Sequence, residues 1–210
     1  LISAERARWF PSSSRLEIDR RPVASDPSNR LLAPRARFQF DTNRLHLPDK
    51  PLLLHWNRRF DPLRTEQRGA AELVLQVQEA DWFPISGRLQ TRGPVMASRR
   101  VPGRPTGQPP QTLSATSLDG NTLSQEYWLR APVRLQDPAD QADLQARDVR
   151  IDLREQLIRS NEPFQGQRGD LQVSGGSFEI NQREHRINIP AACWLRKAGD
   201  DLRARACSWN

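Results

Sequence analysis

The sequence predicts an all-β protein that is elongated, built from repeated strand pairs and open at its ends. Three observations predict this class. Short runs alternate between apolar and polar residues with a period of two, which is the pattern of half-buried strands. The 210 residues include 17 prolines, which break long helices. The alternating runs also recur inside a larger repeat, and stacked repeats of this size form elongated folds.

The repeat begins with an apolar residue, any residue and a second apolar residue, and it ends near a proline. Leu144 and Ala146 open the clearest copy, and Pro163 follows nineteen positions after Leu144. The last four copies begin 27 to 31 residues apart. Other copies begin at Leu31, Leu113, Leu171 and Leu202.

Each copy changes its apolar parity at the same place. Leu144 and Ala146 occupy even positions, whereas Val149 and the apolar residues after it occupy odd positions. A flat strand would place these two sets on opposite faces. A bend at Arg147 and Asp148 would instead turn both sets toward one interior. Repeated bends therefore predict a sheet folded over into two walls.

The N-terminal half is less regular than the rest. Residues 1–30 hold one short alternating piece, so we predict a leading segment with one edge strand. Residues 31–96 are predicted to be N-terminal β repeats, with a turn at Asp41–Asn43 and a strand at Leu73–Val77. Residues 97–111 are rich in proline and arginine, and two interpretations stay open, a long mobile hairpin loop or a seam between two halves.

Residues 112–210 are predicted to be C-terminal β repeats, continuous with the N-terminal part. Each unit consists of two short strands joined by a polar turn. One segment, residues 137–148, is predicted to form a helical turn. The polar turns are predicted at residues 118–121, 154–156 and 181–184.

The formal net charge of +7 comes almost entirely from arginine, because Lys50 and Lys197 are the two lysines. A basic surface suits phosphate, nucleic acid or anionic lipid, but the arginines are spread out, as in an ordinary solvated surface. A nucleic-acid binder is disfavoured because no basic patch is interleaved with aromatic residues. No stretch reaches the roughly 20 apolar residues of a membrane-spanning helix.

Two cysteines, Cys193 and Cys207, flank a turn-like segment. A hairpin closed symmetrically about residue 200 would place them opposite each other, within reach of a disulfide. A shift of one residue in the register would remove that contact, so two unpaired thiols are the alternative. A disulfide would fit an oxidising compartment such as the periplasm.

The repeat frame resembles that of the OstA-type periplasmic lipopolysaccharide-transport family, which includes LptA and LptC. The family pattern is an alanine, two residues and an alternating strand, then a polar turn, a second strand and a proline–apolar step. Here it is Ala146–Leu153, then Leu157–Ser160, then Pro163–Phe164, with the next unit at Gly169–Phe178. The motif is degenerate, so the resemblance rests on repetition, and it is clearest over residues 113–210.

The resemblance implies an elongated twisted β-jellyroll whose two sheets form an apolar trough. It implies a non-catalytic periplasmic component that carries lipopolysaccharide from the inner-membrane transporter toward the outer membrane. The acyl chains would lie in the jellyroll groove. The implied partners are lipopolysaccharide, the inner-membrane ABC transporter and other jellyroll proteins, which pair through edge strands. It leaves open an inner-membrane anchor in an N-terminal segment absent from this chain.

Alternation also defines a set of apolar residues that face the interior. The residues alone favour a closed, dry sandwich core for this set, whereas the resemblance favours a groove for acyl chains. The set contains Phe38, Phe40, Val149, Ile151, Leu153, Phe178, Ile180, Ile187, Ile189 and Trp209.

The alternative function is a β-rich envelope scaffold or carbohydrate-binding module with a closed core. In that protein Trp82, Tyr127 and Trp128 would form a sugar platform. We expect no catalytic residues, no metal site and no cofactor, because no catalytic or phosphate-loop motif occurs. The histidines, His46, His55 and His185, lack metal-ligand spacing and are predicted to lie at the surface.

Overall fold

The computed structural model describes residues 2–25, 28–56, 70–101, 103–105 and 107–209. These residues form 24 strands joined in one antiparallel sheet, which confirms the all-β prediction. Outside the strands, the described part contains two short 3-10 helices, η1 (Pro11–Ser13) and η3 (Pro138–Asp140), and no α-helix. Within it, no helix has the length and apolar character needed to cross a membrane.

The sheet is folded into two walls that share its two longest strands. Wall A contains thirteen strands or half-strands in hydrogen-bonded order. They are β2 (Arg6–Phe10), β3 (Arg15–Asp19), β6 (Arg35–Gln39), β7 (Arg44–Leu47), the C-terminal half of β9 (Leu73–Phe83), the N-terminal half of β10 (Arg88–Arg99), β12 (Ser117–Asn121), β13 (Glu126–Arg130), β16 (Val149–Asp152), β17 (Leu157–Ser160), β20 (Phe178–Asn181), β21 (Arg186–Ile189) and β24 (Cys207–Trp209).

Wall B is built in the same way from the remaining strands. They are β1 (Ile2–Ser3), β4 (Val23–Ser25), β5 (Asn29–Leu32), β8 (Leu52–His55), the N-terminal half of β9, the C-terminal half of β10, β11 (Gln111–Ala115), β14 (Val133–Asp137), β15 (Ala142–Ala146), β18 (Phe164–Arg168), β19 (Leu171–Gly175), β22 (Cys193–Lys197) and β23 (Asp200–Ala204).

The central strands β9 and β10 cross from one wall to the other without a break. One half of β9 pairs with β8 in wall B and the other half with β7 in wall A. The pairing of β9 with β10 shifts register between Arg92 and Val95, around Gly93, whose φ is +75°. This bulge bends the hairpin where the walls meet.

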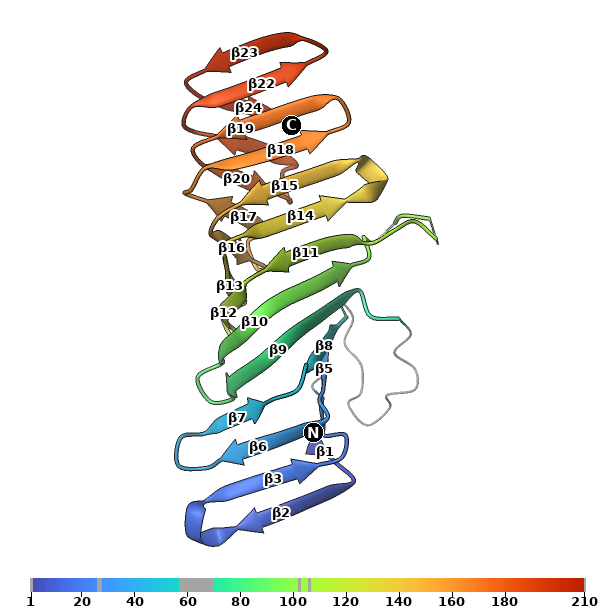
Figure 1. The fold of residues 1–210 in the computed structure, drawn as a ribbon, viewed down its shortest axis with the longest axis vertical. Coiled ribbons are helices and arrows are strands. Elements are labelled where there is room, and N and C mark those ends of the chain that lie inside the picture. The colour runs from blue at the N-terminus through green and yellow to red at the C-terminus, as the bar shows by residue number, and fades with distance from the viewer. Residues whose placement is uncertain (1, 26–27, 57–69, 102, 106, 210) are drawn as a thin grey trace.

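The two walls wind around the long axis of the stack (Figure 1). The connections between the walls lie on the right in the lower, N-terminal part and on the left in the upper, C-terminal part. The long strands β9 and β10 run between these two sides. This rotation is the accumulated twist of many short, paired strands.

The predicted bend at Arg147 and Asp148 is confirmed, because these two residues separate β15 in wall B from β16 in wall A. Ala146 and Val149, on either side of the bend, are both buried. The same arrangement recurs at residues 116, 176–177 and 205–206. The change of parity in the sequence therefore marks the step from one wall to the other.

Three local predictions were wrong. The leading segment contains β1 to β4 and the start of β5 instead of one edge strand, because Pro11 and Pro22 lie between short strands. The polar turn predicted at residues 118–121 lies at 122–125, since the side chain of Asn121 accepts hydrogen bonds from the backbone of the next residues. In the segment 137–148, only η3 is helical, and the rest belongs to β14 and β15.

The segment at residues 97–111 connects two antiparallel neighbours, so it is a hairpin loop, with its first and last residues in β10 and β11. Arg104 in this loop donates to both carboxylate oxygens of Asp137, each at 2.7 Å, and to Asp140 at 2.9 Å. Gln111 donates to the same Asp137 at 2.6 Å. These contacts fasten the loop to the β14–β15 hairpin.

The Asp137 carboxyl provides a test of this attachment. Hydrogen bonds from Arg104 lower its pKa to about 2, against the opposing effect of burial and with help from Gln111. The pKa of Asp137 is lower in the folded protein than in an unfolded chain, so the pairing stabilises the fold fully at pH values above the ordinary carboxyl pKa. This stabilisation is lost as the pH falls toward 2. We expect Arg104→Gln to raise the pKa of Asp137, measured by NMR titration of the carboxyl carbon. The control is Arg134→Gln, which removes the partner of Asp143 and should leave the pKa of Asp137 unchanged. An unchanged pKa of Asp137 in Arg104→Gln would contradict the attachment of the loop.

Candidate functional site

A continuous row of paired strand positions runs along wall A from one end to the other. Each member lies directly across from the next member on the neighbouring strand. All are apolar or aromatic except one glycine, so the side chains from Trp9 to Ile187 form one unbroken contact line. This row, row A, consists of Trp9, Leu16, Phe38, Leu45, Trp82, Leu89, Gly120, Tyr127, Ile151, Ile158, Ile180, Ile187 and Trp209.

Wall B carries a matching row at the equivalent position of each strand. It also contains a single glycine and otherwise only aliphatic residues, with leucine the commonest. Row B consists of Ile2, Ala24, Leu31, Leu53, Leu75, Ala97, Leu113, Leu135, Leu144, Gly166, Val173, Leu195 and Leu202.

The glycine of row A is filled by its neighbour. A Cβ at Gly120 would lie 2.5 Å from the Cδ1 of Tyr127, so the tyrosine ring covers this position. In row B, a Cβ at Gly166 would lie 2.9 Å from Val173 and 3.5 Å from Leu144. Neither glycine therefore interrupts the apolar surface.

Burial decreases with distance from the bend in the repeat around Arg147. In wall A, Val149 beside the bend is 0% exposed, Ile151 in row A is partly exposed, and Leu153 in the turn is 45% exposed. In wall B, Ala146 is buried and Leu144 in row B is partly exposed. The residues at the bends thus form most of the closed core. The described row residues are at least partly exposed, except Leu45 (3% exposed) and Leu89 (9% exposed) of row A, which belong to the core.

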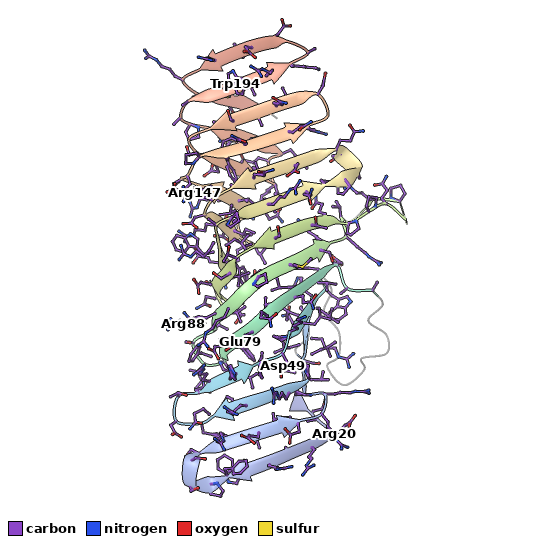
Figure 2. The ribbon with its side chains drawn as sticks, viewed as in Figure 1. Arg20, Asp49, Glu79, Arg88, Arg147 and Trp194 are labelled. Atoms are coloured by element: carbon purple, nitrogen blue, oxygen red, sulfur yellow. A yellow bond between two sulfur atoms is a disulfide. The ribbon has the colours of Figure 1, made fainter. Side chains whose placement is uncertain are left out.

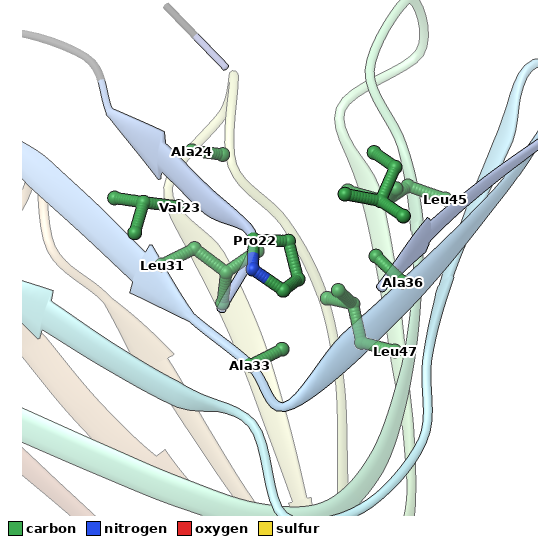
Figure 3. Close-up of a pocket in the computed structure, with 9 residues that line it drawn as sticks. Pro22, Val23, Ala24, Leu31, Ala33, Ala36, Leu45 and Leu47 are labelled. Atoms are coloured by element: carbon green, nitrogen blue, oxygen red, sulfur yellow. The ribbon is translucent and has the colours of Figure 1, made fainter. Parts of the chain in front are cut away.

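The interior beside the bends is filled by side chains. Figure 3 shows an apolar cavity near the N-terminal end, between β4, β5, β6 and β7. Its volume is about 10 Å³, which is no more than the space of one water molecule. Its lining includes the row residues Ala24, Leu31 and Leu45 as well as bend residues, so an additional apolar chain here would have to lie on the open side of the rows.

The predicted interior set is divided between these environments. Phe38, Ile151, Ile180 and Ile187 belong to row A. The bend residues Val149, Phe178 and Ile189 are at most 3% exposed. Trp209 lies in β24 with its backbone paired to Ile187, and its side chain is outside the described residues.

Phe40 and Leu153 were placed in the interior because the alternation was extended one step too far. The strands β6 and β16 end at Gln39 and Asp152, so both residues lie in hairpin turns. Phe40 is 50% exposed and makes edge-to-face ring contacts with Trp9 and Phe38, with centroids 4.9 and 4.7 Å apart.

Row B was missed by the sequence reasoning, although the sequence contains a usable pattern. The apolar residue that opens the repeat copy supplies Leu31, Leu113, Leu144 and Leu202 to this row, and the copy that opens at Leu171 supplies Val173. These residues were used to define the repeat and not as part of a site. Their direct cross-strand pairing depends on the register, which no single segment reveals.

The outer face of wall A carries ion pairs near the centre of the stack. Asp81, only 6% exposed, accepts two hydrogen bonds from Arg44 at 2.7 and 2.8 Å and lies 2.8 Å from Nδ1 of His46. Burial alone would raise the pKa of the Asp81 carboxyl, but these hydrogen bonds outweigh it and lower the pKa. His46 is thus half-buried in an ion-pair network, His55 lies 2.8 Å from Asn29, and His185 is exposed. No cluster suited to a metal ion occurs among the described residues.

The aromatic platform of the alternative function does not form. Trp82 and Tyr127 pack against the interior core. Trp128 faces outward on the same strand as Tyr127, where the guanidinium groups of Arg130 and Arg150 each lie 5.3 Å from its ring centroid. The three rings therefore do not share one surface.

Cys193 and Cys207 form a disulfide, with their Cα atoms 5.9 Å apart. The predicted hairpin register was wrong, because Cys193 lies across from Ala204 in the β22–β23 pair. Ala198 and Gly199, both with positive φ, form a two-residue turn that places the centre of the hairpin before residue 200. Cys207 lies in β24, so the disulfide links wall B to wall A across the last bend.

Comparison with known proteins finds a distant structural similarity. No family model and no curated protein matches the chain. Among solved structures, the chain is similar to LptH from Pseudomonas aeruginosa, the LptA-homologous periplasmic component of the conserved lipopolysaccharide transport device. The similarity covers 75% of this chain and 78% of that chain, with 9% sequence identity and a TM-score of 0.29. At this distance no residues can be equated, so function has to follow from the geometry of this chain.

Proposed function

We propose that this protein is a non-catalytic periplasmic component that carries lipopolysaccharide toward the outer membrane, with the acyl chains lying along rows A and B. The observation that carries the proposal is the continuity of the two rows. Each extends over thirteen neighbouring strands, from an edge strand at one end to an edge strand at the other. A closed core would bury its apolar side chains and would not need a half-exposed row. An acyl chain that slides along the protein needs an apolar row without interruption.

Burial of acyl chains supplies the driving force. Each methylene group transferred from water to an apolar surface contributes roughly 0.8 kcal/mol. Apart from the buried Leu45 and Leu89, the described row residues are at least partly exposed in the protein alone, so a bound chain would cover apolar surface that water now contacts. The charged headgroup would stay at the open side, in solvent.

The disulfide supports an oxidising compartment. Such bonds persist in the periplasm and are rare where thiols are kept reduced. Cys193 is 2% exposed and bonded to Cys207, and no free cysteine remains among the described residues.

The ends of the stack support pairing with other jellyroll proteins and with a transporter-associated partner. Among the described strands, β2 pairs only with β3, and β24 pairs only with β21. Both therefore have one edge of backbone groups available for strand addition. A partner added at either end would extend rows A and B in register.

Photo-crosslinking to lipopolysaccharide tests the function. Photoreactive residues at Ile151 and Val173, in rows A and B, are expected to give lipid adducts. The matched controls are Arg150 and Gln172, the preceding residues on the same strands, which face outward. Equal labelling at the interior and control positions, or no adduct at Ile151 and Val173, would refute the proposal. Phe178 is a poor probe site because it is 3% exposed beside a bend.

A further inference from the structure

The open side of wall B carries cations that continue the interior alternation. Arg99 follows Ala97 of row B by two residues, Arg168 follows Gly166, and Lys197 follows Leu195. Each is exposed and lies at the end of its strand nearest the hairpin loop. The three side chains therefore stand at the rim of the interior, one step beyond row B. The same step also holds Asp137, whose carboxylate is paired with Arg104, and Asp200, which lies across from Lys197.

These cations have no ion-pair partner among the described residues. Several other strand arginines are paired with carboxylates, as Arg44 is with Asp81 and Arg196 with Asp201. Lys197 lies across from Asp200 in the β22–β23 pair, yet no ion pair within 4.0 Å joins them. An unpaired cation beside an apolar row is suited to an anion brought by an amphiphile.

The rim of wall A differs. In its described hairpins, the interior positions one step beyond row A hold no lysine or arginine. They are neutral polar or apolar residues and one histidine, His185. The polar members include Asn43, Thr122, Gln125, Gln156 and Gln182.

We propose that Arg99, Arg168 and Lys197 form a one-sided cationic rim that binds the phosphate groups on the headgroup of an acylated glycolipid. This inference rests on the proposed function and adds the orientation of the bound molecule. The acyl chains lie on the apolar rows, and the phosphates lie against wall B. The neutral rim of wall A faces the uncharged part of the sugar.

The spacing of the rim suits more than one phosphate. Arg168 and Lys197 are separated by two strand intervals, which corresponds to about 9.6 Å along the stack. Arg99 lies four intervals from Arg168, or about 19 Å, in the direction of the N-terminus. A phosphorylated molecule moving along the rows would therefore meet successive cations on the same side.

The test compares lipopolysaccharide with the same preparation after phosphatase treatment. The triple variant Arg99→Gln, Arg168→Gln and Lys197→Gln is expected to bind intact lipopolysaccharide about tenfold more weakly. Its affinity for the dephosphorylated form should equal that of the unmodified protein. The preference of the unmodified protein for the phosphorylated form should also fall as salt is added.

The matched control removes the same charge from the outer surface. Arg88 and Arg147 project outward in Figure 2, and Arg205 is exposed at the last bend. The triple variant of these three to glutamine should keep the preference for phosphate. Equal loss in both triple variants, or no preference in the unmodified protein, would overturn the rim assignment and leave the function standing. If the unmodified protein bound neither the intact nor the dephosphorylated lipopolysaccharide, both the proposed function and the rim assignment would be overturned.

Discussion

Val149→Asp is expected to lower the free energy of unfolding by more than about 4 kcal/mol, enough to prevent folding of many domains. Val149 is 0% exposed beside the bend between β15 and β16. An ionised carboxylate there would have no water and no cation partner in the interior. Urea denaturation followed by circular dichroism would measure the loss, or show that no cooperative transition remains.

Two further positions on the same chain segment serve as controls. Ile151→Asp, in the half-exposed row A, should cost less than Val149→Asp, and Leu153→Asp, in the turn, should change stability by no more than about 0.5 kcal/mol. A graded response would show that the walls diverge from the bend. Equal losses at all three positions would contradict an open side.

Removing the disulfide is the second change with a large expected effect. The cysteines are 14 residues apart, and closing a loop of this length stabilises a protein by about 3 kcal/mol. The double variant Cys193→Ala and Cys207→Ala should lose a similar amount in chemical denaturation. The loss should be concentrated at the C-terminal end, because a stacked repeat couples mainly neighbouring strands.

Hydrogen exchange separates this local effect from a general one. Amides of β22, β23 and β24 should exchange faster in the double variant, whereas those of β9 and β10 should be unchanged. Reductant should produce the same change in the unmodified protein and none in the variant. Faster exchange along the whole stack would show that the disulfide stabilises more than its own end.

The repeat and its change of parity were sufficient to predict the folded-over sheet. Each bend interrupts the alternation at a definite residue pair, as at Arg147 and Asp148, and this irregularity is visible in one sequence. A strand was predicted at Leu73–Val77, the first half of β9, but the crossing of β9 and β10 between the walls was not predicted, because it occurs without such an interruption. Their bend depends on a bulge at Gly93, which a single glycine does not reveal.

The candidate site was only half predictable. Alternation identified the wall A residues such as Ile151 and Ile180, but it could not tell a half-exposed row from the buried bend positions such as Val149. That distinction depends on how far the walls have diverged at each step. The cysteine pairing shows the same limit, since the contact depends on a crossing between walls and not on the hairpin that the spacing suggested.

The thirteen-strand rows also determine how the protein can change in length. Twelve intervals of about 4.8 Å make each row about 58 Å long, nearly twice the roughly 30 Å hydrocarbon thickness of a bilayer. One repeat, such as the segment from Leu144 to Leu171, adds two strands to each wall, or about 10 Å. Duplication or loss of a whole repeat would therefore alter the reach of the protein by a fixed increment, without changing which side chains face inward or which wall carries which rim.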